Sequence, residues 1–171
     1  FLVYRRRRMV DDLSEMIHAN RPYDQIVKKL ITAQGIWTSK PEVNFLTATI
    51  DPNNDNEGPD EVKLAARVSR AFLGVRIDCV QCHDDMFGDR WKQEDFHQLA
   101  SFFAGAEMSL TGLIESEKFY QVRYKRHPEA EPVPPKVPFH EALLPTEGSL
   151  RERLATWVTH PENKPFARAL V

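Results

Sequence analysis

The sequence predicts a mainly α-helical domain with a short β-hairpin and a proline-rich strap. Apolar residues recur at helical spacing in several stretches, and capping or helix-breaking residues bound each of them. Between residues 107 and 145 this periodicity is lost. An alternating segment and then six prolines replace it there, which favours a hairpin followed by extended chain.

Composition limits the classes of function. The 171 residues are 42% hydrophobic and 28% charged, which suits a soluble domain with one real core. The formal net charge of -2 gives no general attraction to nucleic acid, so no nucleic-acid partner is expected. The sequence has no run of about 18 apolar residues, so no membrane span is expected in it.

The first part of the chain predicts an antiparallel pair of helices. Residues 11–20 and 23–33 each carry an apolar stripe, and Asn20-Arg21-Pro22 separates them. Gly35 is placed to cap the second helix. The arginines at residues 5–8 are expected to pair with the following aspartates along a solvated helix face, and a patch for an anionic partner is the alternative.

The next stretch predicts connecting structure. Residues 36–50 carry scattered apolar side chains without a period, which indicates a packed loop. Residues 51–60 are dense in oxygen ligands, so a calcium loop has to be considered. An EF-hand needs glycine at its sixth position and glutamate at its twelfth, where this sequence has Asn56 and Val62. A polar turn is therefore the better prediction.

Two helices are predicted on either side of the only two cysteines. Asp60 is expected to cap a helix over residues 61–72, and Gly74 to end it. The second helix is expected from about Gln93 to Ala104. Its predicted buried stripe excludes Phe102 and consists of Phe96, Leu99, Ala100 and Phe103.

Between these helices lies Cys79-Val80-Gln81-Cys82-His83, the attachment pattern of a c-type haem. In that chemistry both thiols form thioethers with the porphyrin and the histidine binds the iron. Three alternatives stay open. A thioredoxin-like dithiol would need a βαβ setting, a zinc site would need further ligands, and a local disulfide would close only a tiny loop.

The ligand on the other face of the iron is not fixed by this pattern. His97, on the following helix, and Met108 are the candidates for a distal ligand. Met86 lies only three residues after His83, so it can hardly wrap to the opposite face. The aromatic and aliphatic residues expected either to wall a macrocycle or to form a plain core are Phe72, Ile77, Phe87, Trp91, Phe96 and Phe103.

The remaining residues predict a hairpin, a strap and another helix. Thr111-Gly112 and the alternation over residues 118–124 suggest the hairpin, and residues 126–145 the strap. Ser149 and Glu152 form the pattern of a capping box that opens a helix through Val158. The last residues indicate a further helix cut in its middle, so a larger parent protein is expected.

Taken together, several of these features resemble a known family. They are Leu73-Gly74 running into Cys79–Asp84, the Phe102-Phe103 pair that ends the aromatic helix, and Pro22-Tyr23-Asp24-Gln25 at a helix start. The chain resembles the planctomycete cytochrome c-like domain, a domain of unknown function in large exported proteins, over about residues 9–105. Residues 150–171 are similar to the entry of the planctomycete-specific domain that usually follows. Many members carry a second histidine where this sequence has Asp85.

The resemblance implies a division of the chain into three parts. Residues 1–105 would form a helical cytochrome c-like domain, residues 106–148 the hairpin and strap, and residues 149–171 the truncated helical start of a following domain. The expected function is electron transfer by one covalent haem c held by Cys79, Cys82 and His83. The alternative is a structural, zinc-binding or interaction module of an exported enzyme.

The expected setting follows from the haem. Covalent attachment in bacteria takes place outside the cytoplasm, so a periplasmic or extracellular location is expected. The partner would be a redox protein or an adjacent domain of the parent chain. No nucleophile elbow, phosphate loop or HExxH occurs, and the carboxylates of Asp84, Asp85 and Asp89 are expected to form a solvated turn rather than an acid and base pair.

Overall fold

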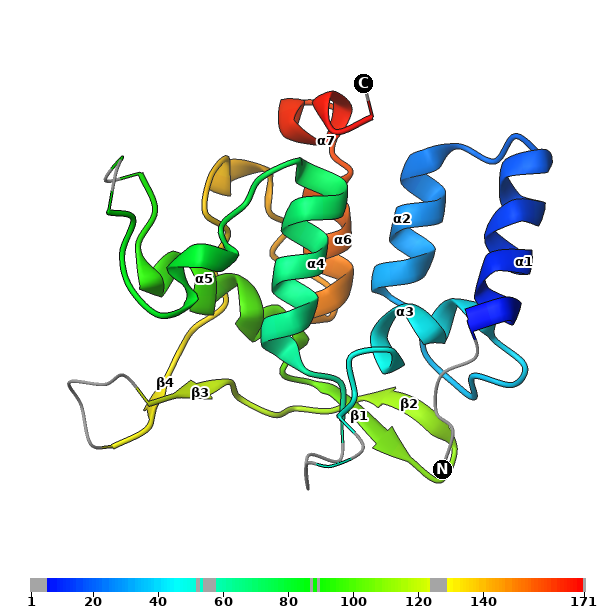
Figure 1. Cartoon of the computed structure of the whole chain (residues 1–171), viewed down its shortest axis with the longest axis horizontal. Helices are drawn as coiled ribbons and strands as arrows, with labels where there is room; N and C mark the ends of the chain where they lie inside the picture. Colours follow the sequence, from blue (N-terminus) through cyan, green and yellow to red (C-terminus); the bar gives the residue numbers. More distant parts are fainter. Residues whose placement is uncertain are drawn as a thin grey trace.

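The computed structural model describes residues 6–51, 53, 58–86, 88, 90–123 and 129–170. Helices α1 (Arg6–His18) and α2 (Tyr23–Ile31) lie antiparallel, as predicted (Figure 1). An ion pair of 3.2 Å between Lys29 and Asp12 joins them. The predicted glycine cap is wrong, because α2 ends at Ile31. Gly35 instead exchanges two backbone hydrogen bonds, of 2.7 and 2.9 Å, with Leu113.

Residues 36–50 contain more regular structure than predicted. A 3-10 helix η1 (Pro41–Val43) runs into one turn of α-helix, α3 (Asn44–Thr47), and most of these side chains are buried. A single turn is too short to show a helical period, so the sequence pattern missed it. Half of the predicted polar turn, Pro52 and residues 54–57, lies outside the described residues.

Helix α4 (Glu61–Leu73) lies at the centre of the molecule and has the predicted ends (Figure 1). A side-chain oxygen of Asp60 accepts the backbone N–H of Lys63 at 2.9 Å, and Gly74 adopts a left-handed φ of 62°. Both signals are local in sequence. The boundaries of this helix were therefore predictable to within one residue.

After α4 the chain forms a 3-10 helix η2 (Asp78–Gln81), then α5 (Gln93–Ala100) and a second 3-10 turn η3 (Ser101–Phe103). Phe102 is fully buried, so the prediction that it stands off the core is wrong. A 3-10 turn advances about 120° per residue instead of about 100°. Because α4 and α6 both contact η3, consecutive phenylalanines there can both pack inward.

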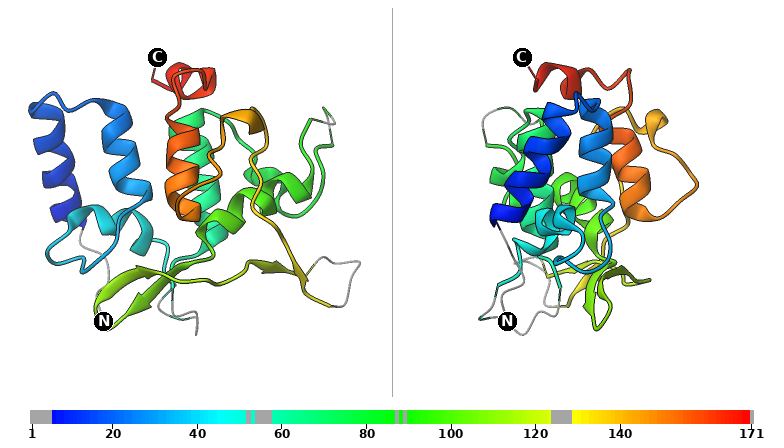
Figure 2. Two further views of the ribbon diagram at one scale, coloured as in Figure 1. Left: turned by 180° about the vertical axis from the view of Figure 1, so that it is seen from behind. Right: turned by 90° about the vertical axis from the view of Figure 1, so that its right-hand side faces the viewer.

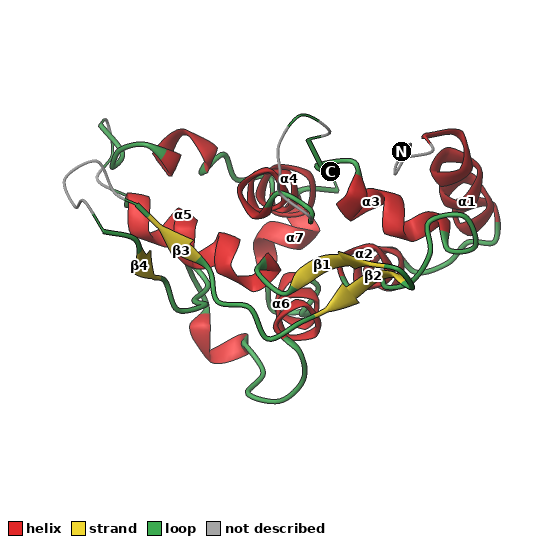
Figure 3. Ribbon diagram, turned by 90° about the horizontal axis from the view of Figure 1, so that it is seen from below, coloured by secondary structure: helices red, strands yellow, loops and turns green. Residues whose placement is uncertain are grey.

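The predicted hairpin exists, but it uses different strands. β1 (Ala106–Ser109) pairs with β2 (Gly112–Glu115), so that Met108 lies opposite Leu113. Of the alternating segment, only β3 (Gln121–Val122) forms a strand, and it pairs with β4 (Glu131–Pro132). Tyr124 and residues 125–128 lie outside the described residues. Figure 3 shows the two pairs well apart.

The strap leads back across the helices to α6. It contains a 3-10 helix η4 (Glu141–Leu143), and its Val133 and Val137 are buried. The capping box of α6 (Leu150–Val158) is confirmed, since Ser149 and Glu152 bond to each other's backbone N–H groups. The final helix α7 (Lys164–Arg168) ends earlier than predicted, at Arg168.

Helix α6 packs against α2, and Figure 2 shows it in front of α4 when the molecule is seen from behind. Its Trp157 and Leu154 belong to the same hydrophobic cluster as residues of α2, α4 and α5. The chain is thus mainly helical with a short hairpin. The three-part division of the chain stays a prediction.

Candidate functional site

The two cysteines lie on an exposed turn that the core fixes from beneath. Val80, between them, is fully buried, whereas Cys79 and Cys82 are exposed. Side chains three residues apart in a 3-10 helix lie above one another. Because η2 runs up to Cys82, the two thiols therefore project on the same side of the turn.

Both thiols are free in this structure. The Sγ atom of Cys79 lies 3.6 Å from the carbonyl oxygen of Arg76, a weak contact. Two accessible thiols on one side of a short turn can react with a neighbouring pair of electrophilic carbons, bind a soft metal, or join to each other. The turn itself does not choose among these reactions.

His83, the next residue, is also exposed, but its ring is oriented. Its Nδ1 lies 2.7 Å from the carbonyl oxygen of Asp84. Since a carbonyl only accepts, this contact selects the tautomer of the neutral ring in which Nδ1 carries the hydrogen and Nε2 has the lone pair. This is the usual arrangement of a histidine that binds a metal through Nε2.

His97 is buried and contacts the same turn. Its Nε2 donates to the carbonyl oxygen of Gln81 at 3.1 Å, and its Nδ1 accepts from the hydroxyl of Tyr120 at 2.9 Å. Burial lowers the pKa of His97, and the hydrogen bond to Gln81 partly opposes that shift. His97 thus ties the cysteine turn to the segment before β3.

The turn is also fastened to the start of α5. Gln93 donates its backbone N–H to the Asp84 carboxylate at 2.8 Å, and its side-chain amide to the Gln81 carbonyl at 2.9 Å. The backbone N–H of Asp85 bonds to the carbonyl of Trp91 at 2.9 Å. The Asp84 carboxylate therefore binds the first backbone N–H of α5. Asp89, the last of the three predicted carboxylates, lies outside the described residues.

The candidate distal ligands lie in different places. His97 is next to the cysteine turn, whereas Met108 is half-buried in β1, against the core. Met86 is 71% exposed. Among the residues predicted to wall a macrocycle, Phe87 lies outside the described residues. The ring of Trp91 packs on that of Phe139, with 6.1 Å between the ring centroids. The others are in the hydrophobic core: Phe72, Ile77, Phe96 and Phe103.

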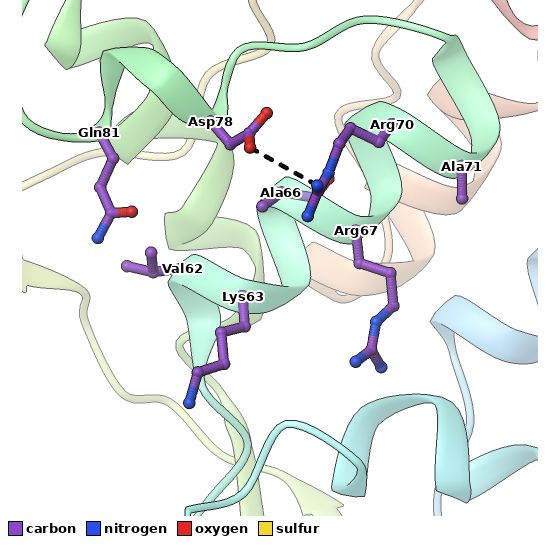
Figure 4. Close-up of a pocket in the computed structure, with 8 residues that line it drawn as sticks. All are labelled: Val62, Lys63, Ala66, Arg67, Arg70, Ala71, Asp78 and Gln81. Atoms are coloured by element: carbon purple, nitrogen blue, oxygen red, sulfur yellow. Dashed lines mark hydrogen bonds and ion pairs between the residues drawn. The ribbon is translucent and has the colours of Figure 1, made fainter.

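A groove of about 660 Å³ lies beside the turn (Figure 4). Its walls come from α4 and η2, and they are Val62, Lys63, Ala66, Arg67, Arg70, Ala71, Asp78 and Gln81. Arg70 pairs with Asp78 at 3.8 Å, and Lys63 with Asp60 at 3.1 Å. The guanidinium of Arg67 donates to the carbonyl of Phe45 at 2.6 Å.

Neither this groove nor the role of Tyr120 was predicted from the sequence. The three cations have the spacing i, i+4 and i+7, which places them on one face of a helix and is visible in the sequence. Tyr120 carried no such signal. Its contact with His97 spans 23 positions and depends on how the strand segment crosses α5.

Within the described ranges, no three His, Cys, Asp or Glu side chains come together to hold a metal ion. None of the helices in this part of the chain has the length and apolar character needed to cross a membrane.

Comparison with known proteins gives one match. The model of the family PSCyt2, described as a protein of unknown function (DUF1549), matches residues 3–108. Neither the curated proteins nor the solved structures gave a match. This match supports the resemblance to a planctomycete-type domain of unknown function that the sequence indicated. A cytochrome c-like nature does not follow from the match.

Proposed function

Since this chain belongs to the PSCyt2 family, whose function is unknown, we propose from its own site that it is a c-type haem-binding, electron-transfer domain of a larger exported protein. The observation that carries the proposal is the pairing of two exposed thiols on one side of η2 with the oriented ring of His83. A periplasmic or extracellular location is part of the proposal, because the attachment chemistry takes place outside the cytoplasm.

The donor set fits one haem. The Sγ atoms of Cys79 and Cys82 would each add to a porphyrin vinyl group, with an S–C bond formed and the thiol proton passed to the other vinyl carbon. Nε2 of His83 would hold the iron, and the Asp84 carbonyl would orient the ring by accepting the Nδ1–H of the neutral tautomer. When bound, the haem supplies one-electron redox chemistry.

Exposure of the turn supports electron transfer as the role. The thiols lie at the surface, so an edge of the attached ring would be open to a redox partner or an adjacent domain. His97 and Met108 remain the proposed distal ligands. In this structure both ring nitrogens of His97 bond within the protein, so it would have to release the Gln81 carbonyl to reach the iron.

The test is expression in a host that matures cytochromes c. We expect an absorbance band typical of haem that survives acid-acetone extraction, and its loss in Cys82→Ala. Extractable haem, or unchanged covalent haem in Cys82→Ala, would refute the anchoring role. Stoichiometric zinc without iron by elemental analysis would favour the alternative structural module. If His97 is the distal ligand, His97→Ala will shift the visible spectrum. An unchanged spectrum would mean that His97 only holds the cysteine turn in place through its hydrogen bond to Gln81.

A further inference from the structure

We infer that the groove between α4 and η2 holds the carboxylate edge of the porphyrin, an inference that rests on the proposed function. The groove and the cysteine turn share a wall. Asp78 and Gln81 both line the groove (Figure 4), and they directly precede Cys79 and Cys82 in the sequence. In a 3-10 helix they lie above one another, about 120° around the axis from the cysteines. A ring attached to the thiols would therefore reach the groove with one edge.

The charge of the groove suits that edge. Lys63, Arg67 and Arg70 project from one face of α4, and Asp78 is the one carboxylate among the lining residues. These four residues carry a formal charge of +2, whereas the whole sequence carries -2. A haem has two propionates, which the apolar core beneath Val80 would not accept as anions. Guanidinium and ammonium groups are the donors that carboxylates prefer.

The ion pairs that Lys63 and Arg70 make in this structure leave both side chains able to bind a propionate. The side chains of Lys63 and Arg70 are 53% and 51% exposed, so their ion pairs with Asp60 and Asp78 are of the weak, solvent-screened kind. Arg67 is held more firmly, because it donates to Phe45 and lies 5.6 Å from that ring's centroid. The volume of about 660 Å³ falls within the range of small-molecule sites, about 300 to 1,000 Å³.

The first test compares Lys63→Gln/Arg70→Gln with a control of equal charge change, Arg7→Gln/Arg8→Gln. The control arginines are exposed on α1, far from η2 (Figure 1). In matured protein we expect both variants to keep covalent haem. At low ionic strength the groove variant should have a lower reduction potential, because removing nearby cations disfavours the reduced iron. Equal potentials in wild type, control and groove variant would overturn the inference.

A second test needs no attached haem. Apo protein is titrated with mesoporphyrin, which has two propionates but no vinyl groups, and with its dimethyl ester, followed by tryptophan quenching. We expect the groove variant, but not the control, to bind the diacid about tenfold more weakly, and the ester equally. Equal binding of the diacid by all three proteins would overturn the inference. If matured wild type lacks covalent haem but groove-dependent binding persists, the thioether proposal fails and the groove assignment stands.

Discussion

Arg151 allows a quantitative test of how helix α6 is attached to the rest of the molecule. It is 1% exposed, and its guanidinium pairs with Glu115 of β2. It also donates to the carbonyls of Ile31 and Ala33, at 3.1 and 2.8 Å. Arg151→Met keeps the apolar stem but leaves a carboxylate and two carbonyls without their donor. Breaking a buried ion pair from one side costs about 3–5 kcal/mol. Since the Glu115 side chain is 18% exposed, we expect about 3 kcal/mol.

The assay is urea denaturation at pH 7, followed by circular dichroism. The matched control is Arg153→Met on the same helix, which removes one hydrogen bond to the Pro145 carbonyl and should cost about 1 kcal/mol. In Arg151→Met/Glu115→Gln the orphaned charge is gone, so the double variant should lose less than the sum of the single variants. A loss below about 1 kcal/mol in Arg151→Met, or strict additivity, would refute the reasoning.

Two further predictions concern His97 and the turn of the hairpin. Because burial lowers the pKa of His97, the unfolded chain takes up a proton first as pH falls below about 6.5, and the free energy of unfolding should decline there. In His97→Gln this part of the decline should disappear, and identical pH profiles from 7.5 to 5 would contradict it. A Cβ on Gly112 would lie 2.3 Å from the Gly35 carbonyl, so Gly112→Ala should cost at least about 2 kcal/mol. Gly148→Ala, with a similar φ but a flexible side chain as nearest neighbour, is its control in thermal unfolding and should cost clearly less.

Features set by neighbouring residues were predictable from the sequence. The caps of α4 and α6 depend on Asp60, Gly74 and Ser149, each within a few residues of its partner. Partners distant in sequence were not predictable. Phe102 is buried because two helices approach η3, and Tyr120 meets His97 because of the path of the strand.

The family match ends at residue 108, inside β1. A polypeptide trimmed to that span would lack β2, and with it every hydrogen bond that β1 makes to its neighbouring strand. It would also uncover the side of α2 on which α6 rests and take away the hydroxyl that steadies His97. The matched span is therefore shorter than the packed unit that the structure describes, and expression boundaries should be chosen from the contacts of α6.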